Sequence, residues 1–318
     1  MTTGEALAGR RDGWITAPFR FYEDHRFCMF HADEQEVWAV DDTGFSIPAS
    51  GLPEPEPVPD TARADFETAV EAAVADLLAG HFSKTALSKV RNQKLDTGFD
   101  WADWFRAACV RFPNALVFFV HVPGAFTWAG ATPELFLSAD GNRVRSVSLA
   151  GTLHPDSPGS WTSKEAEEQA LVTDYIRDIF YRSGFPKVTV SGPEVLRIGS
   201  LQHLKTAFDS PYSVEAGGLG RLVENLHPTP AVGGMPKREG VDFLLAHERH
   251  ARRMYSGFLG SLSAEGELDL YVNLRSMSVD RHGALLYAGA GITGRSLPEA
   301  EWLETENKLA MNLDLLRG

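Results

Sequence analysis

The chain has 318 residues, 43% of them hydrophobic, and a formal net charge of −13. A chain of this size can bury a large core, and its acidic balance argues against nucleic acids and anionic membranes as partners. Two cysteines, no apolar leader segment and no apolar run near the ~20 residues that span a bilayer indicate a globular protein of the reducing cytoplasm.

The first quarter of the chain predicts strands followed by a helix. Residues 14–22 and 36–47 have the composition of strands, and a proline-rich link follows them. Over residues 60–78 apolar side chains recur at helical spacing, and Gly80 ends the pattern. We therefore expect an amphipathic helix between the link and Gly80.

More strands are predicted over residues 83–149. Between Lys84 and Lys89 the residues alternate as in a half-buried strand. Residues 101–110 are expected to form a short helix. The stretch 114–149 then reads as strand upon strand, with a hairpin turn at Gly141-Asn142.

A long helix is predicted over residues 162–181, where Thr162 and Glu165 fit a capping box. Its expected buried stripe consists of Val172, Tyr175, Ile176 and Ile179. Continued towards the N-terminus, this stripe runs through Glu168 and Glu165, although carboxylates are expected on the opposite, solvated face. The pattern therefore indicates a polar cavity at the start of the helix.

The remaining segments complete the predicted fold. A helix is expected to end at His247, and strands are expected near 187–197, 200–208, 255–263, 268–280 and 284–288. Strands dominate and mostly follow one another as hairpins. We therefore expect an α+β fold of large antiparallel β-sheets sandwiched by helices.

A glycine turn is predicted after residue 288, where Gly289, Gly291 and Gly294 would let backbone approach a ligand. These glycines also match G-x-G-x-x-G, the dinucleotide fingerprint. That site needs a βαβ unit and a helix start ready for phosphate. Glu299 and Glu301 stand at this helix start and would repel phosphate, so we reject the dinucleotide interpretation.

The helix after this turn is expected to carry an acidic face. Ser296 and Glu299 fit a capping box. Glu301, Glu304 and Lys308 follow at offsets of three and four, so they share one face. Stacked carboxylates repel each other, which favours a nearby cation. Taken alone, however, such charges are more often a solvated helix face.

Several segments, taken in order, carry a family resemblance. They are Lys84-Thr-Ala-Leu-Ser, Ala131-Thr-Pro-Glu134, Leu149-Ala-Gly-Thr152, Lys164-Glu-Ala-Glu-Glu168, Leu201-Gln-His-Leu204, residues 226–237, Tyr255-Ser-Gly257, Asn273-Leu-Arg275, Gly289-Ala-Gly-Ile292 and Glu304-Thr-Glu-Asn-Lys308. Together they resemble the chorismate-utilising enzymes, which include isochorismate, salicylate and anthranilate synthases. The resemblance implies that family's fold, with residues 60–318 as the chorismate-binding catalytic core and residues 1–59 as a shortened N-terminal strand region of the same domain.

The resemblance also implies the catalytic pair. Lys84 matches the general base, which takes a proton from a water molecule that attacks C2 of chorismate. Glu134 matches the general acid, which protonates the departing C4 hydroxyl.

A metal site and a substrate site are implied in the same way. Glu168 and Glu304 match the ligands of Mg²⁺, and Glu165 and Glu301 stand one turn before them. The positions that match substrate-binding residues are Gly151, Thr152, His203, Tyr255, Arg275, Gly289, Gly291 and Lys308.

Lys84 together with Ala150 is similar to the water-adding members of the family. The segments at residues 271–277, 286–293 and 226–237 most resemble those of the menaquinone-pathway isochorismate synthases. Salicylate synthases share both residues and add a pyruvate elimination, so that alternative stays open, with a siderophore rather than menaquinone as the end product. A catalytically silent relative that binds chorismate is the alternative from another class.

We expect no glutamine amidotransferase subunit, and a monomer or weak homo-oligomer. Gln169 departs from the family pattern, in which histidine commonly follows the metal-binding glutamate.

Overall fold

The computed structural model describes residues 12–34, 36, 39, 47, 51–96, 98–153, 161, 163–198, 201–213 and 218–317. Within these ranges the side chains of residues 24, 150–152, 163–165, 167, 168, 198 and 201 lie outside the description. The chain divides into two compact units whose segments alternate along the sequence. Unit 1 comprises Met1–Asp33, Glu134–Ala231 and Gly257–Val272, and unit 2 comprises Glu34–Pro133, Val232–Ser256 and Asn273–Gly318. The predicted boundary after residue 59 stays a prediction.

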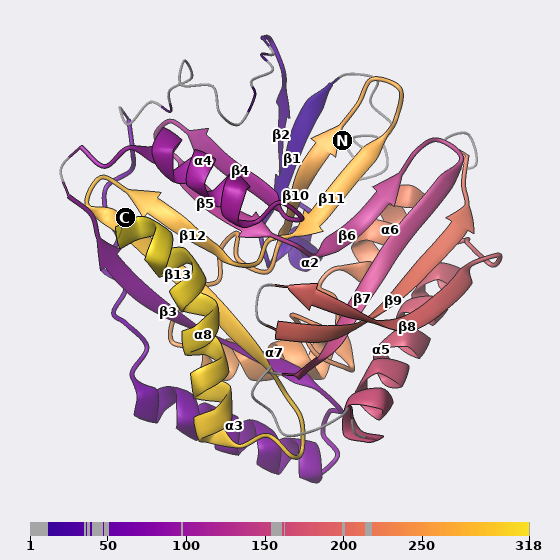
Figure 1. Cartoon of the computed structure of the whole chain (residues 1–318). Helices are drawn as coiled ribbons and strands as arrows, with labels where there is room; N and C mark the ends of the chain where they lie inside the picture. The colour runs from indigo at the N-terminus through magenta and orange to yellow at the C-terminus, as the bar shows by residue number, and fades with distance from the viewer. Residues whose placement is uncertain are drawn as a thin grey trace. The chain divides into compact units, whose positions relative to one another are not determined.

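Unit 1 is built on an eight-stranded antiparallel sheet with the order β2-β1-β10-β11-β6-β7-β9-β8 (Figure 1). Its strands are β1 (Gly13–Ala17), β2 (Cys28–His31), β6 (Leu135–Ala139), β7 (Arg143–Leu153), β8 (Thr189–Ile198), β9 (Leu201–Pro211), β10 (Phe258–Leu262) and β11 (Leu268–Val272). Its helices are α2 (Phe21–Asp24), α5 (Ser163–Arg182) and α6 (Leu219–Leu226). Helix α5 packs on β7 and β9 and buries Val172, Ile176 and Ile179, which confirms most of the predicted stripe.

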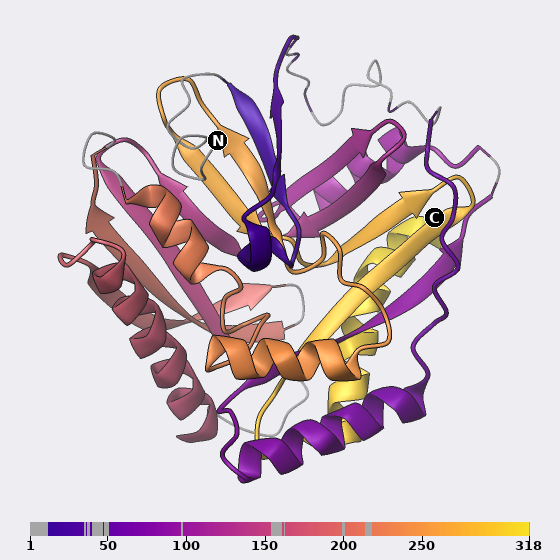
Figure 2. The same ribbon diagram turned by 180° about the vertical axis from the view of Figure 1, so that it is seen from behind.

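Unit 2 is built on a five-stranded antiparallel sheet with the order β3-β13-β12-β5-β4. Its strands are β3 (Thr85–Lys94), β4 (Leu116–Val122), β5 (Phe126–Thr132), β12 (Ser276–Asp280) and β13 (Gly283–Ile292). Its helices are α3 (Arg63–Leu78), α4 (Trp101–Arg111), α7 (Lys237–His247) and α8 (Pro298–Arg317). Helices α3 and α7 both contact β3 and can be followed in Figure 2.

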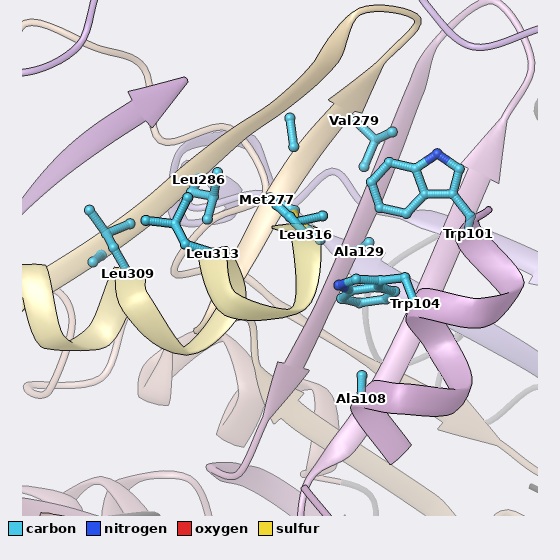
Figure 3. Close-up of a cluster of buried hydrophobic side chains, with 12 residues drawn as sticks. Trp101, Trp104, Ala108, Ala129, Met277, Val279, Leu286, Leu309, Leu313 and Leu316 are labelled. Carbon is cyan, nitrogen blue, oxygen red and sulfur yellow. The ribbon is translucent and has the colours of Figure 1, made fainter. Parts of the chain in front are cut away.

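The core of unit 2 lies between its sheet and two of its helices. Leu309, Leu313 and Leu316 of α8 point towards the strands that carry Met277 and Leu286 (Figure 3). Trp101 and Trp104 of α4 belong to the same buried cluster. This packing fixes how α8 lies on the sheet, and therefore which face of α8 is turned away from the core.

Most predicted helices and strands are confirmed, including α3, α4, α5 and the hairpin at Gly141, whose φ is +80°. The predicted strand 14–22 is too long, because β1 ends at Ala17 and α2 follows. Most of the predicted strand 36–47 lies outside the described residues. The sequence reasoning missed α6 and β2.

The predicted strand 268–280 is wrong, because two strands of different sheets occupy it. β11 pairs with β6 in unit 1, whereas β12 pairs with β5 in unit 2. Between them Arg275 has φ +49°, a left-handed conformation that strand residues do not adopt. The apolar side chains stand at even-numbered positions up to Leu274 and at odd-numbered positions from Met277, so the alternation changes phase at Arg275, and the prediction of one continuous strand overlooked this signal.

Two details of the C-terminal segment also differ from the prediction. β13 continues through Gly289 and Gly291 to Ile292, so these glycines lie in a strand paired with β3, not in a turn. Ser296 is not the N-cap, because its hydroxyl accepts the N–H of Thr293 at 3.1 Å and α8 begins at Pro298.

Candidate active site

Lys84 lies immediately before β3 and is held by its main chain. Its N–H donates to the carbonyl of Met235 at 3.2 Å, and its carbonyl accepts the Met235 N–H at 2.8 Å. The residue is only 5% exposed. A Cβ atom built on Gly291 would lie 3.5 Å from Lys84 Cε and 3.8 Å from Nζ. The amine therefore lies against the glycine backbone of β13.

The predicted acidic face of α8 is present. Lys308 Nζ donates to Glu304 Oε1 at 2.7 Å and to the carbonyl of Gly289 at 2.7 Å. Glu301 stands one turn earlier and is buried. Lys308 thus connects the acidic face to the same glycine strand that Lys84 approaches.

Tyr255 reaches this strand from another segment of unit 2. Its hydroxyl would lie 2.9 Å from a Cβ atom built on Gly289, and the Leu87 carbonyl would lie 3.0 Å from it. The Tyr255 ring stacks on Tyr287, with centroids 5.2 Å apart. A side chain at position 289 would be forced against the Tyr255 hydroxyl and crowd the Leu87 carbonyl, which favours glycine there.

Arg275 is placed by backbone contacts. Its carbonyl accepts hydrogen bonds from Asn312 Nδ2 at 2.9 Å and from the Ala131 N–H at 3.2 Å. Its Nη1 lies 2.9 Å from the Met311 sulfur on α8. Unit 2 therefore contains Lys84, Tyr255, Arg275, Gly289, Gly291, Glu301, Glu304 and Lys308 of the predicted set.

The other predicted residues belong to unit 1. Glu134 is buried just before β6, and its carbonyl accepts the Val272 N–H at 2.9 Å. Thr152 and His203 are partners on β7 and β9, and the register shift between Ala150 and Thr152 marks Gly151 as a bulge. Glu165 and Glu168 lie at the start of α5, and their side chains are outside the described set.

Gln169, the departure from the family pattern, is bound to the sheet through its amide nitrogen, while its buried Oε1 has no hydrogen-bond partner among the described residues. Its Nε2 donates to Ser148 Oγ at 2.9 Å and to Thr206 Oγ1 at 2.6 Å. The side chain is buried where α5 packs on β7 and β9. Glutamine therefore ties α5 to the sheet at the residue after Glu168.

Sequence reasoning missed a buried polar cluster beside β3, formed by Ser88, Glu248, His250 and Arg252. Arg252 binds both carboxylate oxygens of Glu248, at 2.8 and 2.6 Å. Ser88 Oγ lies 2.8 Å from Glu248 Oε1 and 3.0 Å from His250 Nε2. A cavity of about 250 Å³ adjoins Ser88, Glu248 and His250. The only signal in the sequence is the spacing of Glu248 and Arg252, which also occurs on ordinary surface helices.

Burial and pairing shift the pKa values in this cluster. Burial acts to raise the pKa of Glu248, but the Arg252 guanidinium, with smaller contributions from His250 and the Ser88 hydroxyl, outweighs burial and holds that pKa below its usual range. Burial is the main cause that lowers the pKa of His250, partly offset by Glu248. The cluster therefore favours an ionised carboxylate beside a neutral imidazole.

Among the side chains that the structure describes, no group of three or more His, Cys, Asp or Glu residues has the geometry of a metal site. The carboxylates of Glu165 and Glu168 are not among those side chains, so the predicted magnesium site stays a prediction. In the same described part of the chain, no helix combines the length and apolar character needed to cross a membrane.

The fold and the residues around β13 agree with the family assignment. The family model of the chorismate binding enzymes matches residues 49–317, which is most of the chain. The chain therefore belongs to the chorismate binding enzyme family.

Individual relatives share its fold and part of its sequence. The salicylate biosynthesis isochorismate synthase of Pseudomonas aeruginosa is 30% identical over 78% of this chain and 54% of its own length. The isochorismate synthase EntC of Escherichia coli K12 is 28% identical over 79% of this chain and 66% of its own length. The structure of MenF, the menaquinone-specific isochorismate synthase of Escherichia coli, superposes with a TM-score of 0.71 at 28% identity, covering 85% of this chain and 62% of that one. The chain thus spans between about half and two thirds of these relatives.

Proposed function

We propose that the chain is an isochorismate synthase, which adds water at C2 of chorismate and removes the C4 hydroxyl. One observation carries this proposal: in a member of the chorismate binding family, the Lys84 amine is buried against the glycine backbone of β13. Glycine at position 291 leaves backbone, with no side chain of its own, beside the Lys84 amine, and a buried amine in such a place supports a chemical role.

The proposed reaction needs one base and one acid. Neutral Lys84 takes a proton from a water molecule, whose oxygen forms a bond to C2 of the ring. Both double bonds of the ring shift, the C4–O bond breaks, and Glu134 donates its proton to the departing hydroxyl. One water enters and one leaves, so the product is an isomer of the substrate, and no ammonia-supplying amidotransferase is required.

The proposed substrate site uses cations and hydrogen-bond donors in an otherwise acidic protein. Lys308 and Arg275 provide positive charge for the carboxylates of chorismate, and the Tyr255 hydroxyl and the N–H groups of Gly289 and Gly291 would add hydrogen bonds. Gly151, Thr152 and His203 complete the proposed set from unit 1.

The donor chemistry on α8 fits Mg²⁺. Glu301 and Glu304 offer partly or fully buried carboxylate oxygens one turn apart, the ligand type that Mg²⁺ prefers. Glu168 and Glu165 would contribute the carboxylates of α5. Once bound, the ion would neutralise and orient a substrate carboxylate.

We assign the product to menaquinone biosynthesis, because the name of the MenF structure and the segment at residues 226–237 both favour that pathway. Salicylate formation is the second candidate, since the name of the Pseudomonas aeruginosa relative places that enzyme in salicylate biosynthesis.

The test is to incubate the purified protein with chorismate and Mg²⁺, with and without EDTA, and to separate the products by chromatography. Isochorismate alone, formed only without EDTA, is the expected result. Salicylate with pyruvate would keep the residue roles and change the assigned product. Bound but unreacted chorismate would contradict the proposed activity and favour a silent relative.

A further inference from the structure

The outer edge of β3 is covered by side chains instead of another strand. The Val90 N–H donates to Thr61 Oγ1 at 3.0 Å, and the Asn92 N–H donates to Asp60 Oδ1 at 2.7 Å. Nearer to Lys84 the partner of this edge is the buried ion pair between Glu248 and Arg252. Their side chains are 6% and 3% exposed.

Arg252 joins three segments of unit 2. Besides its two contacts with Glu248, its Nη1 donates to the Val232 carbonyl at 2.7 Å. Its Nη2 also donates to the Ala86 carbonyl of β3. The planar guanidinium thus fixes the distance between β3 and the segment that begins at Val232.

Glu248 completes the connection on β3. Its Oε1 accepts the Ser88 N–H at 2.7 Å and the Ser88 hydroxyl at 2.8 Å. Arg252 and Glu248 therefore bind β3 at positions two and four residues after Lys84. The segment from Val232 reaches Met235, which pairs with the main chain of Lys84. The ion pair therefore holds the chain on both sides of Lys84: at Ala86 on β3, and at Val232 in the segment that pairs with Lys84.

If these side chains served only to cover the edge of β3, they would not need to be charged. Replacing a buried ion pair by apolar residues of similar volume is often neutral or stabilising, because desolvation opposes the attraction. What the bidentate pair adds is a fixed geometry. We infer that the Glu248–Arg252 ion pair is a positioning element for Lys84, which sets where the amine stands relative to the glycine backbone of β13. This inference rests on the proposed function for its catalytic consequence only.

The first test compares Arg252→Lys, Glu248→Gln and, as a control, Arg238→Gln. Arg238 lies on α7 with its side chain 88% exposed. Lysine keeps the charge of Arg252 but loses the fork that binds Glu248 and two carbonyls. We expect kcat for chorismate to fall at least about tenfold in Arg252→Lys and Glu248→Gln, with KM changed less than about threefold, because misplacing a reacting group acts on the chemical step. Arg238→Gln should match the wild type.

A second readout does not depend on turnover. A small amine-acylating reagent labels the folded protein, and peptide mass spectrometry gives the labelling rate of Lys84 relative to that of exposed Lys94 at the end of β3. In Arg252→Lys and Glu248→Gln this ratio should change at least about threefold, because the surroundings of the Lys84 amine change. Hydrogen exchange of the Ser88 amide reports whether the contact between residue 248 and β3 is weakened in each variant. If Arg252→Lys does not fold, Glu248→Gln is used alone.

The outcomes separate the two proposals. An unchanged labelling ratio and unchanged kcat, together with faster exchange at Ser88, would overturn the positioning role. A changed labelling ratio in a protein that does not convert chorismate would support positioning while refuting the proposed function. A lower unfolding temperature with wild-type kcat and labelling would show that the pair serves stability alone.

Discussion

β3 in unit 2 and β8 in unit 1 each stand at the end of a sheet, where one side of the strand pairs with no other described strand, and these two edges are protected in opposite ways. The first six residues of β3 are buried, and side chains of Asp60, Thr61, Glu248 and Arg252 bind its outer edge. β8 is exposed along nearly all of its described length. Its pairing with β9 is interrupted between Ser191 and Glu194, where Gly192 and Pro193 stand.

The difference shows what each kind of protection achieves. A bulge with proline only has to prevent pairing with another chain, which needs no fixed geometry. Covering an edge with a buried ion pair is costlier and constrains the strand at defined points. The costlier solution is found on the strand that follows Lys84, which connects the architecture of this edge to the proposed chemistry.

The largest expected effect comes from removing the proposed base. Lys84→Gln keeps the length and polarity of the side chain but cannot accept the proton, so we expect kcat to fall about 10²–10⁴-fold. Initial rates of isochorismate formation measure the loss, and circular dichroism verifies that the variant is folded. Lys94→Gln, at the exposed end of β3, is the matched control and should keep wild-type activity. Near-normal turnover by Lys84→Gln would remove the proposed role.

The next effect concerns stability. Arg252→Ala leaves the Glu248 carboxylate buried without its bidentate partner and removes the donors to the Ala86 and Val232 carbonyls. Breaking a buried pair in this way costs about 3–5 kcal/mol of unfolding free energy. Urea denaturation followed by intrinsic fluorescence gives the change. A loss below about 1 kcal/mol would mean that water or neighbouring groups compensate Glu248, and that the edge of β3 is held by other contacts.

Sequence patterns recovered the elements whose buried face repeats regularly. Helices α3 and α5 followed from apolar stripes, and the hairpin at Gly141 followed from its turn residues. β3 was expected to be half-buried but is buried on both faces over Thr85–Val90, because α3, α7 and α8 all pack against it. Periodicity along one segment cannot report which distant helices cover it.

The candidate site shows the same limit. Glu301, Glu304 and Lys308 could be placed on one face from their spacing, and the Lys308–Glu304 contact confirms that geometry. The role of Gly289 depends on Tyr255, which is 34 positions away in the chain, and local spacing does not reveal that approach. Glu248 and Arg252 were missed for a similar reason, since their partners Ala86 and Ser88 lie on another segment.

A smaller effect is expected from pH at the same edge. Burial lowers the pKa of His250 in the folded state below the ordinary value near 6.5, so protons bind the unfolded chain more readily. The stability that neutral His250 contributes is complete above about pH 6.5 and is lost as pH falls through the folded-state pKa. The groups that face His250 are Glu248, Arg252, Ser88 and Tyr287, so protonation adds a cation beside Arg252.

The variant His250→Phe separates this contribution from that of Glu248. Glu248 has a pKa held below its usual range, so its own loss of stability occurs at lower pH. Between about pH 6.5 and 5, the unfolding free energy of the wild type should therefore fall more steeply than that of His250→Phe, by about 1.4 kcal/mol for each unit of pKa shift. If the unfolding free energies of the two proteins depended on pH in the same way, protonation of the His250 imidazole would not affect stability.

The smallest effect is expected at the edge of β8. Glu194 Oε1 lies 3.1 Å from Lys205 Nζ, but the Glu194 side chain is 65% exposed. Exposed pairs contribute about 0–1 kcal/mol, so Glu194→Ala should change the unfolding free energy by less than about 0.5 kcal/mol and leave kcat unchanged. The same urea titration that measures Arg252→Ala provides the comparison. If Glu194→Ala destabilised the protein as much as Arg252→Ala, the contrast between β8 and β3 would be wrong. Both edges would then depend on a charged pair for their stability.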